Sequence, residues 1–188
     1  MTNENLDRLR IELSAKAKNG TDFTLAASII WLIIAYVWTL KIDPYNKSIL
    51  VFIAGAPLLP FAYGFSRLLK TNWKVENNPL QPLGLWLNFA QLFYFPFLVF
   101  TMIKSPDYFI MVYAIITGGH FFPYAWFYMT NWYAIFAGII VVGSLMLGLN
   151  LPADKFYFIA VFTSICMFIL TACLYADSVR KARLTNNS

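Results

Sequence analysis

The amino-acid sequence predicts an all-α, polytopic integral membrane protein, in which six transmembrane helices form a compact bundle preceded by a short amphipathic helix. Of the 188 residues 60% are hydrophobic, and the mean hydropathy is +0.61. Only 12% of the residues are charged, about half of the roughly 25% that soluble domains carry. The apolar residues gather into six segments, each near the ~20 residues with which a helix crosses a bilayer. The lipid bilayer is therefore the first expected partner of this chain.

Residues 1–20 are expected to form a cytosolic amphipathic helix ahead of the first crossing. Leu6, Leu9 and Leu13 recur at helical spacing, while charged residues occupy the other faces. This polar start lacks the apolar central region of a signal peptide. We therefore expect the first apolar segment to be retained as a spanning helix.

Residues 21–179 are expected to hold the six crossings, and residues 180–188 a basic cytosolic tail. The apolar segments lie at about 23–40, 48–69, 83–103, 107–129, 132–149 and 154–176. Short loops make sequential helices antiparallel neighbours. Because only Met129-Thr130-Asn131 joins the fourth segment to the fifth, a re-entrant element over residues 107–132 stays open as an alternative to a full crossing.

Several residues are typical of helix ends. Gly20 is predicted to end a helix in a left-handed conformation. Thr21 or Asp22, and later Ser48, are predicted helix caps. Further helix starts are predicted at Pro82, at Ser105-Pro106-Asp107 and at Pro152 with Asp154. The similar strings "KTNWK" at 70–74 and "MTNWY" at 129–133 also fall at predicted helix ends. They are consistent either with a duplicated hairpin or with the ordinary preference of Asn and Trp for helix ends and interfaces.

The distribution of lysine and arginine predicts the orientation. With six crossings, ten of the 14 basic residues fall on the side that holds both termini. Because cytosolic loops are enriched in lysine and arginine, both termini are expected in the cytosol.

None of the nine acidic residues lies at the centre of a predicted crossing. A carboxylate at the membrane centre costs at least ~2.5 kcal/mol and normally marks an ion or proton path, so this pattern argues against a carboxylate-driven pump or exchanger. The other polar side chains of the apolar segments fall in the cytosolic half of the predicted bundle or at its interface. This distribution predicts a polar and aromatic pocket open to the cytosol. The candidate ligand-binding residues are His120, Asn88, Gln91, Tyr124, Phe121, Trp126 and Arg67.

The stretch "GGHFFPYAWFYMTNW" at 118–132 holds the only histidine and seven aromatic rings. Gly118 and Gly119 weaken a helix, and Pro123 cannot donate to the carbonyl of Gly119, so the chain is expected to kink or unwind beside His120. Broken helices at membrane depth face protein or a wet cavity, and the rings could wall a pocket for a flat or cationic ligand. A scaffold with an interfacial aromatic belt stays open as the alternative.

The preferred interpretation is binding or transport of a small amphipathic or cationic molecule in this pocket. The alternatives are a non-catalytic accessory protein that packs against another membrane protein, and a membrane enzyme that uses His120 as its sole acid-base group. A small-residue pattern on the fifth segment suits close helix contact within the chain or in a homodimer. Its members are Ala134, Gly138, Ser144 and Gly148.

Other site classes are not predicted. The sequence shows no complete catalytic set, no cofactor or phosphate-binding motif and no metal-ligand cluster. Nor does it show a basic face that would suit nucleic acid. Cys166 and Cys173 are about 10.5 Å apart along one helix, which is too far for a disulfide, so they are expected to be small apolar filler.

With "GGHFFPYAWFY", "NNPLQPLGLW" and "LRIELSAKAKNG", the chain resembles a family of small bacterial membrane proteins known as a domain of unknown function. The resemblance covers nearly the whole chain, and its most specific part is the run from His120 to Tyr124. It implies a bacterial inner-membrane protein and carries over no activity.

Overall fold

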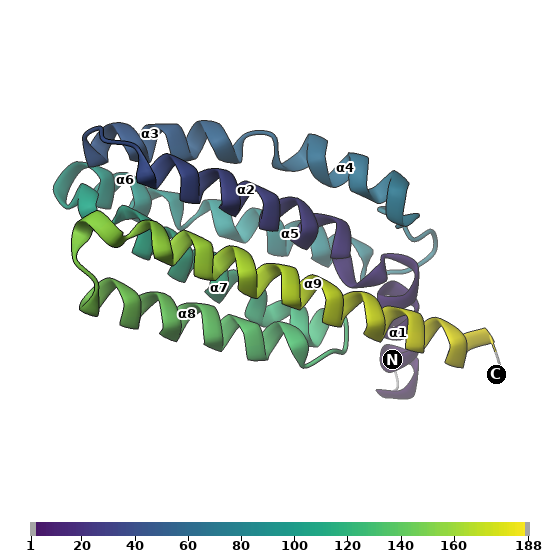
Figure 1. Cartoon of the computed structure of the whole chain (residues 1–188). Coiled ribbons are helices and arrows are strands. Elements are labelled where there is room, and N and C mark those ends of the chain that lie inside the picture. The colour runs from purple at the N-terminus through teal and green to yellow at the C-terminus, as the bar shows by residue number, and fades with distance from the viewer. Residues whose placement is uncertain (1–2, 187–188) are drawn as a thin grey trace.

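The computed structural model describes residues 3–186, and the side chains of residues 4–183, as an all-helical bundle (Figure 1). Its elements are α1 (Asn3–Lys16), η1 (Lys18–Gly20), α2 (Thr21–Thr39), α3 (Pro44–Gly55), α4 (Leu58–Leu69), α5 (Gln81–Leu92), α6 (Phe95–Lys104), η2 (Pro106–Tyr108), α7 (Phe109–Phe127), α8 (Trp132–Asn150), η3 (Ala153–Lys155) and α9 (Tyr157–Asn186). No strand occurs among the described residues. The predicted fold class is therefore confirmed.

Within residues 3–186, six helical stretches are long and apolar enough to cross a membrane, as predicted. They are Lys18–Thr39, Pro44–Leu69, Gln81–Lys104, Pro106–Phe127, Trp132–Asn150 and Ala153–Arg183. Both termini lie at one end of the bundle, which we call the terminal end (Figure 1). The re-entrant alternative for residues 107–132 is wrong, because α7 is a full-length helix that packs along α8.

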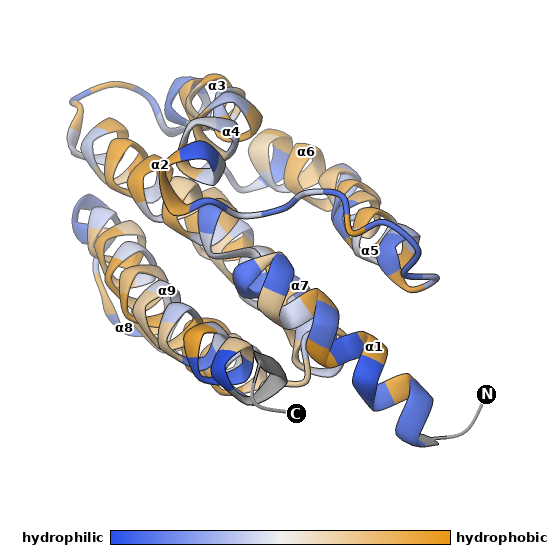
Figure 2. Ribbon diagram, turned by 90° about the vertical axis from the view of Figure 1, so that its right-hand side faces the viewer, coloured by the Kyte–Doolittle hydropathy of each residue, from blue (hydrophilic) through white to orange (hydrophobic). Residues whose placement is uncertain are grey.

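The helices form three layers (Figure 2). The pair α8 and α9 makes one outer layer, α2 and α7 lie in the middle, and the pairs α3–α4 and α5–α6 make the other outer layer. The core lies between α2, α7, α8 and α9, where Ile34, Ile110, Ile140 and Leu170 are fully buried. The α5–α6 layer is the least covered and presents its apolar side chains outward.

Proline breaks the second and third crossings instead of the fourth. One crossing is interrupted before α4 at Ala56–Pro57, and another before α6 at Phe93–Tyr94, ahead of Pro96. By contrast, α7 stays helical through Gly118, Gly119 and Pro123, so the predicted unwinding beside His120 is wrong. The physical reason is the close contact of α7 with α8, which supports the helix along its length.

Glycine at 118 allows that contact. A Cβ atom on Gly118 would lie 2.8 Å from Ile140 Cγ2 of α8, whereas one on Gly119 would meet nothing within 4 Å. Only one of the two glycines is therefore needed for helix packing. Its role is close approach between helices, as is common for small residues in membranes.

Two predicted helix caps are corrected. Asp43, not Ser48, caps the second crossing, because its Oδ1 accepts a hydrogen bond from the Tyr45 amide at 2.8 Å. Ser48 lies inside α3, where its hydroxyl donates to the Pro44 carbonyl at 2.9 Å. The side chains of Thr21 and Asp22 do not cap α2. Gly20 is left-handed as predicted, with φ of 70°, but it is the last residue of η1 and directly precedes α2.

The two similar strings end α4 and α7 with the same backbone geometry. Lys70 and Met129 are left-handed, with φ of 54° and 52°. The amide of the following residue then donates to a carbonyl five residues back, from Thr71 to Ser66 at 2.9 Å and from Thr130 to Ala125 at 3.0 Å. This is the Schellman arrangement of a helix end. The shared letters therefore correspond to a shared helix ending and need no duplicated hairpin.

The four residues predicted for a homodimer contact on α8 do not form one exposed face. Ser144 and Gly148 are buried within the chain, and Gly148 packs against Met111 of α7. Ala134 is half-buried and Gly138 is exposed, with open space above its Cα. A contact between two copies that uses all four residues at once is therefore incompatible with this fold, because Ser144 and Gly148 are covered by the chain itself.

Candidate functional site

The predicted polar residues of α5 do not hydrogen-bond with His120. Asn88 is exposed, and its Nδ2 donates to the Gly84 carbonyl of the same helix at 3.0 Å. Gln91 is half-buried. Among the described residues, no hydrogen bond joins Asn88 or Gln91 to His120 or to Tyr124.

Asn88, Gln91 and His120 nevertheless lie at a similar depth along the axis of the bundle. Gly84 of α5 contacts the ring of Phe127 in α7, and the two helices run in opposite directions. Gln91 and His120 each lie seven residues, about 10.5 Å, from that contact towards the membrane centre. The helical periodicity of the sequence is therefore enough to predict that Gln91 and His120 lie at a similar depth. It is not enough to predict that the face of α5 with Asn88 is exposed.

His120, Phe121 and Tyr124 do come together. The His120 ring meets the Tyr124 ring edge-on, with centroids 5.3 Å apart. Phe121 and Tyr124 are buried, and both rings pack against Tyr133 of α8. The Tyr124 hydroxyl is buried without a hydrogen-bond partner in the described structure. In the described structure these rings pack against one another and against α8.

The other two predicted residues bind groups of the chain itself. Arg10 of α1 lies over the Trp126 ring at 4.6 Å, and its Nε donates to the Trp126 carbonyl at 2.7 Å. Arg67 donates to the hydroxyl of Tyr63 one turn earlier in α4 and lies over the same ring. The cation that Trp126 was expected to attract is therefore supplied by the amphipathic helix.

Sequence reasoning missed a buried ion pair at the terminal end. Lys181 Nζ lies 2.7 Å from Asp177 Oδ2, and both side chains are at least nine-tenths buried. Lys181 also donates to the carbonyls of Tyr128 and Met129, at 2.9 and 2.8 Å, and to the Ser14 hydroxyl at 3.1 Å. These contacts join α1, the turn between α7 and α8, and α9. The predicted separate tail at 180–188 is thus corrected, because α9 continues through it to Asn186; residues 187 and 188 lie outside the described part.

Asn19 extends this network across the start of α2. Its Nδ2 donates to Asp177 Oδ2 at 3.2 Å and to the Leu174 carbonyl at 2.9 Å. Its own carbonyl accepts from the Tyr133 hydroxyl at 2.7 Å. Buried polar groups that are satisfied in this way fix one arrangement of the surrounding helices.

A second buried carboxylate holds the loop between α4 and α5. Asp22 is 1% exposed, and its Oδ2 accepts hydrogen bonds from the Thr71 hydroxyl at 2.8 Å and from the Trp73 indole. The Trp73 ring stacks on Phe23 with centroids 5.0 Å apart. Burial raises the pKa of the nearby Tyr128, and the negative charge of Asp22 adds to this shift. The Thr and Trp of "KTNWK" are therefore partners of Asp22.

The amphipathic helix is joined to the same loop. Asn78 Nδ2 donates to the Leu9 carbonyl at 2.9 Å and to Glu12 Oε2 at 3.0 Å. The Lys16 ammonium, 2.6 Å from Glu12 Oε1, holds the pKa of Glu12 below its usual value together with Asn78. In the described chain α1 is thus packed onto the terminal end as part of the bundle.

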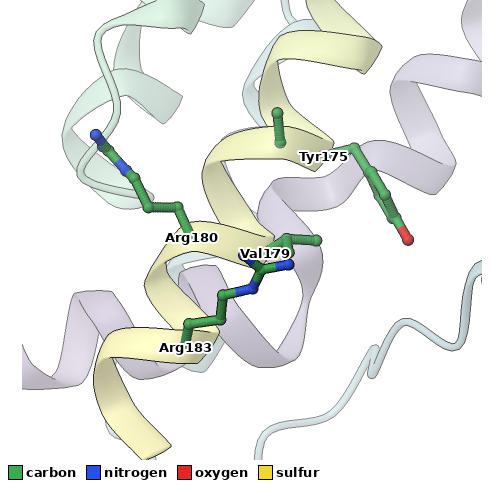
Figure 3. Close-up of a pocket in the computed structure, with 5 residues that line it drawn as sticks. Tyr175, Val179, Arg180 and Arg183 are labelled. Atoms are coloured by element: carbon green, nitrogen blue, oxygen red, sulfur yellow. The ribbon is translucent and has the colours of Figure 1, made fainter. Parts of the chain in front are cut away.

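The cavities of interest lie on α9 at the terminal end, away from the predicted residues. A shallow hollow of about 570 Å³ is lined by Tyr175, Ala176, Val179, Arg180 and Arg183. A second hollow, of about 220 Å³, shares Val179 and Arg183 with it and adds Ala15, Lys18, Ser178 and Ala182. We call the two together the basic groove. Arg180 and Tyr175 extend to different sides of α9, and Arg183 turns back over Val179 (Figure 3).

Each cation of the basic groove is positioned differently. Arg180 is paired with Asp177 Oδ1 at 2.9 Å. Lys18 donates to the Leu69 carbonyl at 2.6 Å, and its ammonium lies 5.6 Å from the centre of the Tyr175 ring. The groove therefore combines an apolar floor with three basic side chains, an arrangement that can hold an acidic group beside an apolar chain.

Comparison with known proteins locates the chain in one family. No curated protein and no solved structure matches it. Residues 6–177, which include most of α1, the first five long apolar helices and most of the sixth, match the family described as a family of unknown function, DUF7010. The chain belongs to this family of unknown function, DUF7010.

Proposed function

We propose that the protein binds a small amphipathic molecule with an acidic head in the basic groove. The observation that carries the proposal is the pairing of an apolar floor, at Ala176 and Val179, with the basic side chains of Lys18, Arg180 and Arg183. Arginine forks suit carboxylate and phosphate oxygens because they can donate two parallel hydrogen bonds. The proposed ligand is amphipathic, as expected from the sequence. It has an acidic head instead of a cationic one, and it binds in the basic groove instead of beside His120.

The interior of the bundle supports a structural role for the remaining candidates. His120, Phe121 and Tyr124 pack against neighbouring rings, and Trp126 already holds Arg10. One observation favours the interior as a second candidate site. The buried Tyr124 hydroxyl has no hydrogen-bond partner in the described structure, and the Tyr124 ring contacts the His120 ring.

We further propose that the terminal end faces the cytosol of a bacterial inner membrane. The excess of lysine and arginine at this end supports this orientation. Binding without transport is the simpler activity for the basic groove, because the groove lies on the outside of α9 and needs no path through the bundle.

Thermal unfolding of the protein in a non-ionic detergent tests the binding proposal. Dodecyl phosphate is expected to raise Tm, whereas dodecyltrimethylammonium is not. The Lys18→Gln/Arg183→Gln variant should lose most of this rise, and the exchange Lys74→Gln, also at the terminal end, should keep it. The triple variant His120→Ala/Asn88→Ala/Gln91→Ala should respond like the wild type. A response to the cationic amphiphile that disappears in the triple variant would place the site inside the bundle and overturn the proposal.

A further inference from the structure

We infer that the basic groove is a headgroup site for an anionic phospholipid of the leaflet at the terminal end, with the lipid phosphate between Lys18 and Arg183. This inference rests on the proposed function and names its ligand class. It is carried by the depth of the groove in the bilayer, by its charges and by its open side.

The depth follows from the length of α9. The helix begins at Tyr157, beside the short turn at the opposite end of the bundle. From there Tyr175 is about 27 Å along the axis and Arg183 about 39 Å, at 1.5 Å per residue. The hydrocarbon core is about 30 Å thick, and the bilayer with its headgroups is about 40–45 Å. Tyr175 therefore lies near the edge of the acyl chains, and Arg183 lies among the headgroups.

The side chains change character at the same depth. Ala176 and Val179 form the apolar floor next to Tyr175, the Lys18 ammonium lies beside the Tyr175 ring, and Arg183, further along α9, lines both hollows. A phospholipid has the same order of groups, with acyl chains first and phosphate next. A free phosphate ion would use only the outer, basic part of the groove. The match over both parts favours a lipid as the source of the acidic group.

The positive charges of the groove favour anionic over zwitterionic phospholipids. Asp177 takes up both Arg180 and Lys181 as ion-pair partners. In the described structure no carboxylate lies within ion-pair distance of Lys18 or Arg183, so neither of these groove-lining charges is neutralised by an ion pair, although Lys18 also donates to the Leu69 carbonyl. A phosphate bound there would be stabilised by both cations. The ammonium of a zwitterionic headgroup would meet them as like charges, so an anionic headgroup is preferred.

The open side suits a ligand that stays in the membrane. The first hollow is wide and shallow, and Tyr175 beside it is 42% exposed. A lipid can enter such a groove sideways while its acyl chains remain in the bilayer. An enclosed pocket would instead require the whole molecule to leave the lipid phase.

Lipid binding can be measured by native mass spectrometry after reconstitution with equal amounts of phosphatidylglycerol and phosphatidylcholine. We expect retained phosphatidylglycerol to exceed phosphatidylcholine by about tenfold, the ratio that a repulsion of about 1.4 kcal/mol between the choline ammonium and the two cations would give. Lys18→Gln and Arg183→Gln should each reduce this preference, and Arg183→Lys should keep part of it. Lys74→Gln, another exposed cation of the terminal end, serves as the matched control and should leave it unchanged.

The outcomes separate the inference from the proposed function. If dodecyl phosphate stabilises the protein but phosphatidylglycerol is retained no better than phosphatidylcholine, the groove binds an acidic amphiphile and the lipid assignment is wrong. If inorganic phosphate alone gives the full stabilisation, the apolar floor plays no part and the lipid is again excluded. If none of these probes responds to Lys18→Gln or Arg183→Gln, both proposals fail.

Discussion

Lys181 is the residue on which the polar contacts of the terminal end converge. Its ammonium reaches α1, the turn between α7 and α8, and Asp177 of its own helix. Taking charges out of water is costly, so such a pair contributes less to stability than its short distance suggests. Its larger effect is to specify how these three parts of the chain meet.

Removing one member of this pair should be strongly destabilising. Lys181→Met leaves the Asp177 carboxylate without its buried partner, which costs about 3–5 kcal/mol in comparable cases. We therefore expect a clear loss of Tm in detergent. The double variant Lys181→Met/Asp177→Asn should recover part of the loss, since no unpaired buried charge remains. A double variant no more stable than the single one would show that packing, rather than charge, dominates at this position.

Glu12 gives a prediction for pH. Its pKa is lowered from the ordinary value of 4.5, first by the hydrogen bond from Lys16. The ionised form is thus favoured by folding, and this stabilisation is present above pH 4.5 and lost as the pH falls through the lower folded-state pKa. Glu12→Gln should therefore lower Tm slightly at pH 7, with a difference that shrinks below pH 4. A difference that stays constant down to pH 3 would assign the effect to Asn78 packing alone.

At the scale of elements, the contact between α7 and α8 makes the two neighbouring glycines of α7, Gly118 and Gly119, different in their packing. Gly118 faces Ile140 and Val141 closely, and Gly119 faces open space. Both lie in a continuous helix, so their difference is one of packing rather than of backbone conformation.

The two glycines offer a matched pair of substitutions. Gly118→Ala should destabilise the protein by about 1–3 kcal/mol, because the added methyl group overpacks the contact between α7 and α8. Gly119→Ala should be neutral or stabilising by up to ~1 kcal/mol, since alanine favours a helix. Thermal unfolding of both variants in the same detergent checks this. Equal effects would mean that α7 and α8 are packed less tightly than described.

At the scale of the whole molecule, the six long helices leave the two ends of the bundle on opposite sides of a membrane. Lys41 lies in the turn between α2 and α3, and Lys74 lies in the loop between α4 and α5. Both are exposed. These two positions can therefore report which side each end faces.

Thiol labelling in whole cells tests the orientation. A membrane-impermeant maleimide should label Lys41→Cys from outside, and Lys74→Cys only after the membrane is permeabilised. The native Cys166 is buried and Cys173 is half-buried, so the unsubstituted chain provides the background. The opposite pattern would reverse the proposed orientation and place the basic groove in the outer leaflet.

The sequence by itself determined the six crossings, the placement of both termini at one end and the helix endings at Lys70 and Met129. These features are local, because they depend on apolar length, on the number of crossings and on the residues next to each helix end. The same local patterns also placed His120, Asn88 and Gln91 at one level. They could not say which face of α5 turns outward.

Only the tertiary structure decided which groups meet. Asp22 finds Thr71 and Trp73, which follow it by 49 and 51 residues, and Lys181 reaches Ser14 across 167 residues. Arg10 likewise takes the Trp126 ring that was expected to bind a ligand. Helical periodicity shows which residues share a face, but a polar partner on another helix is set by how the helices pack. For that reason the basic groove, built from η1 and the end of α9, appears only when those distant segments are brought together.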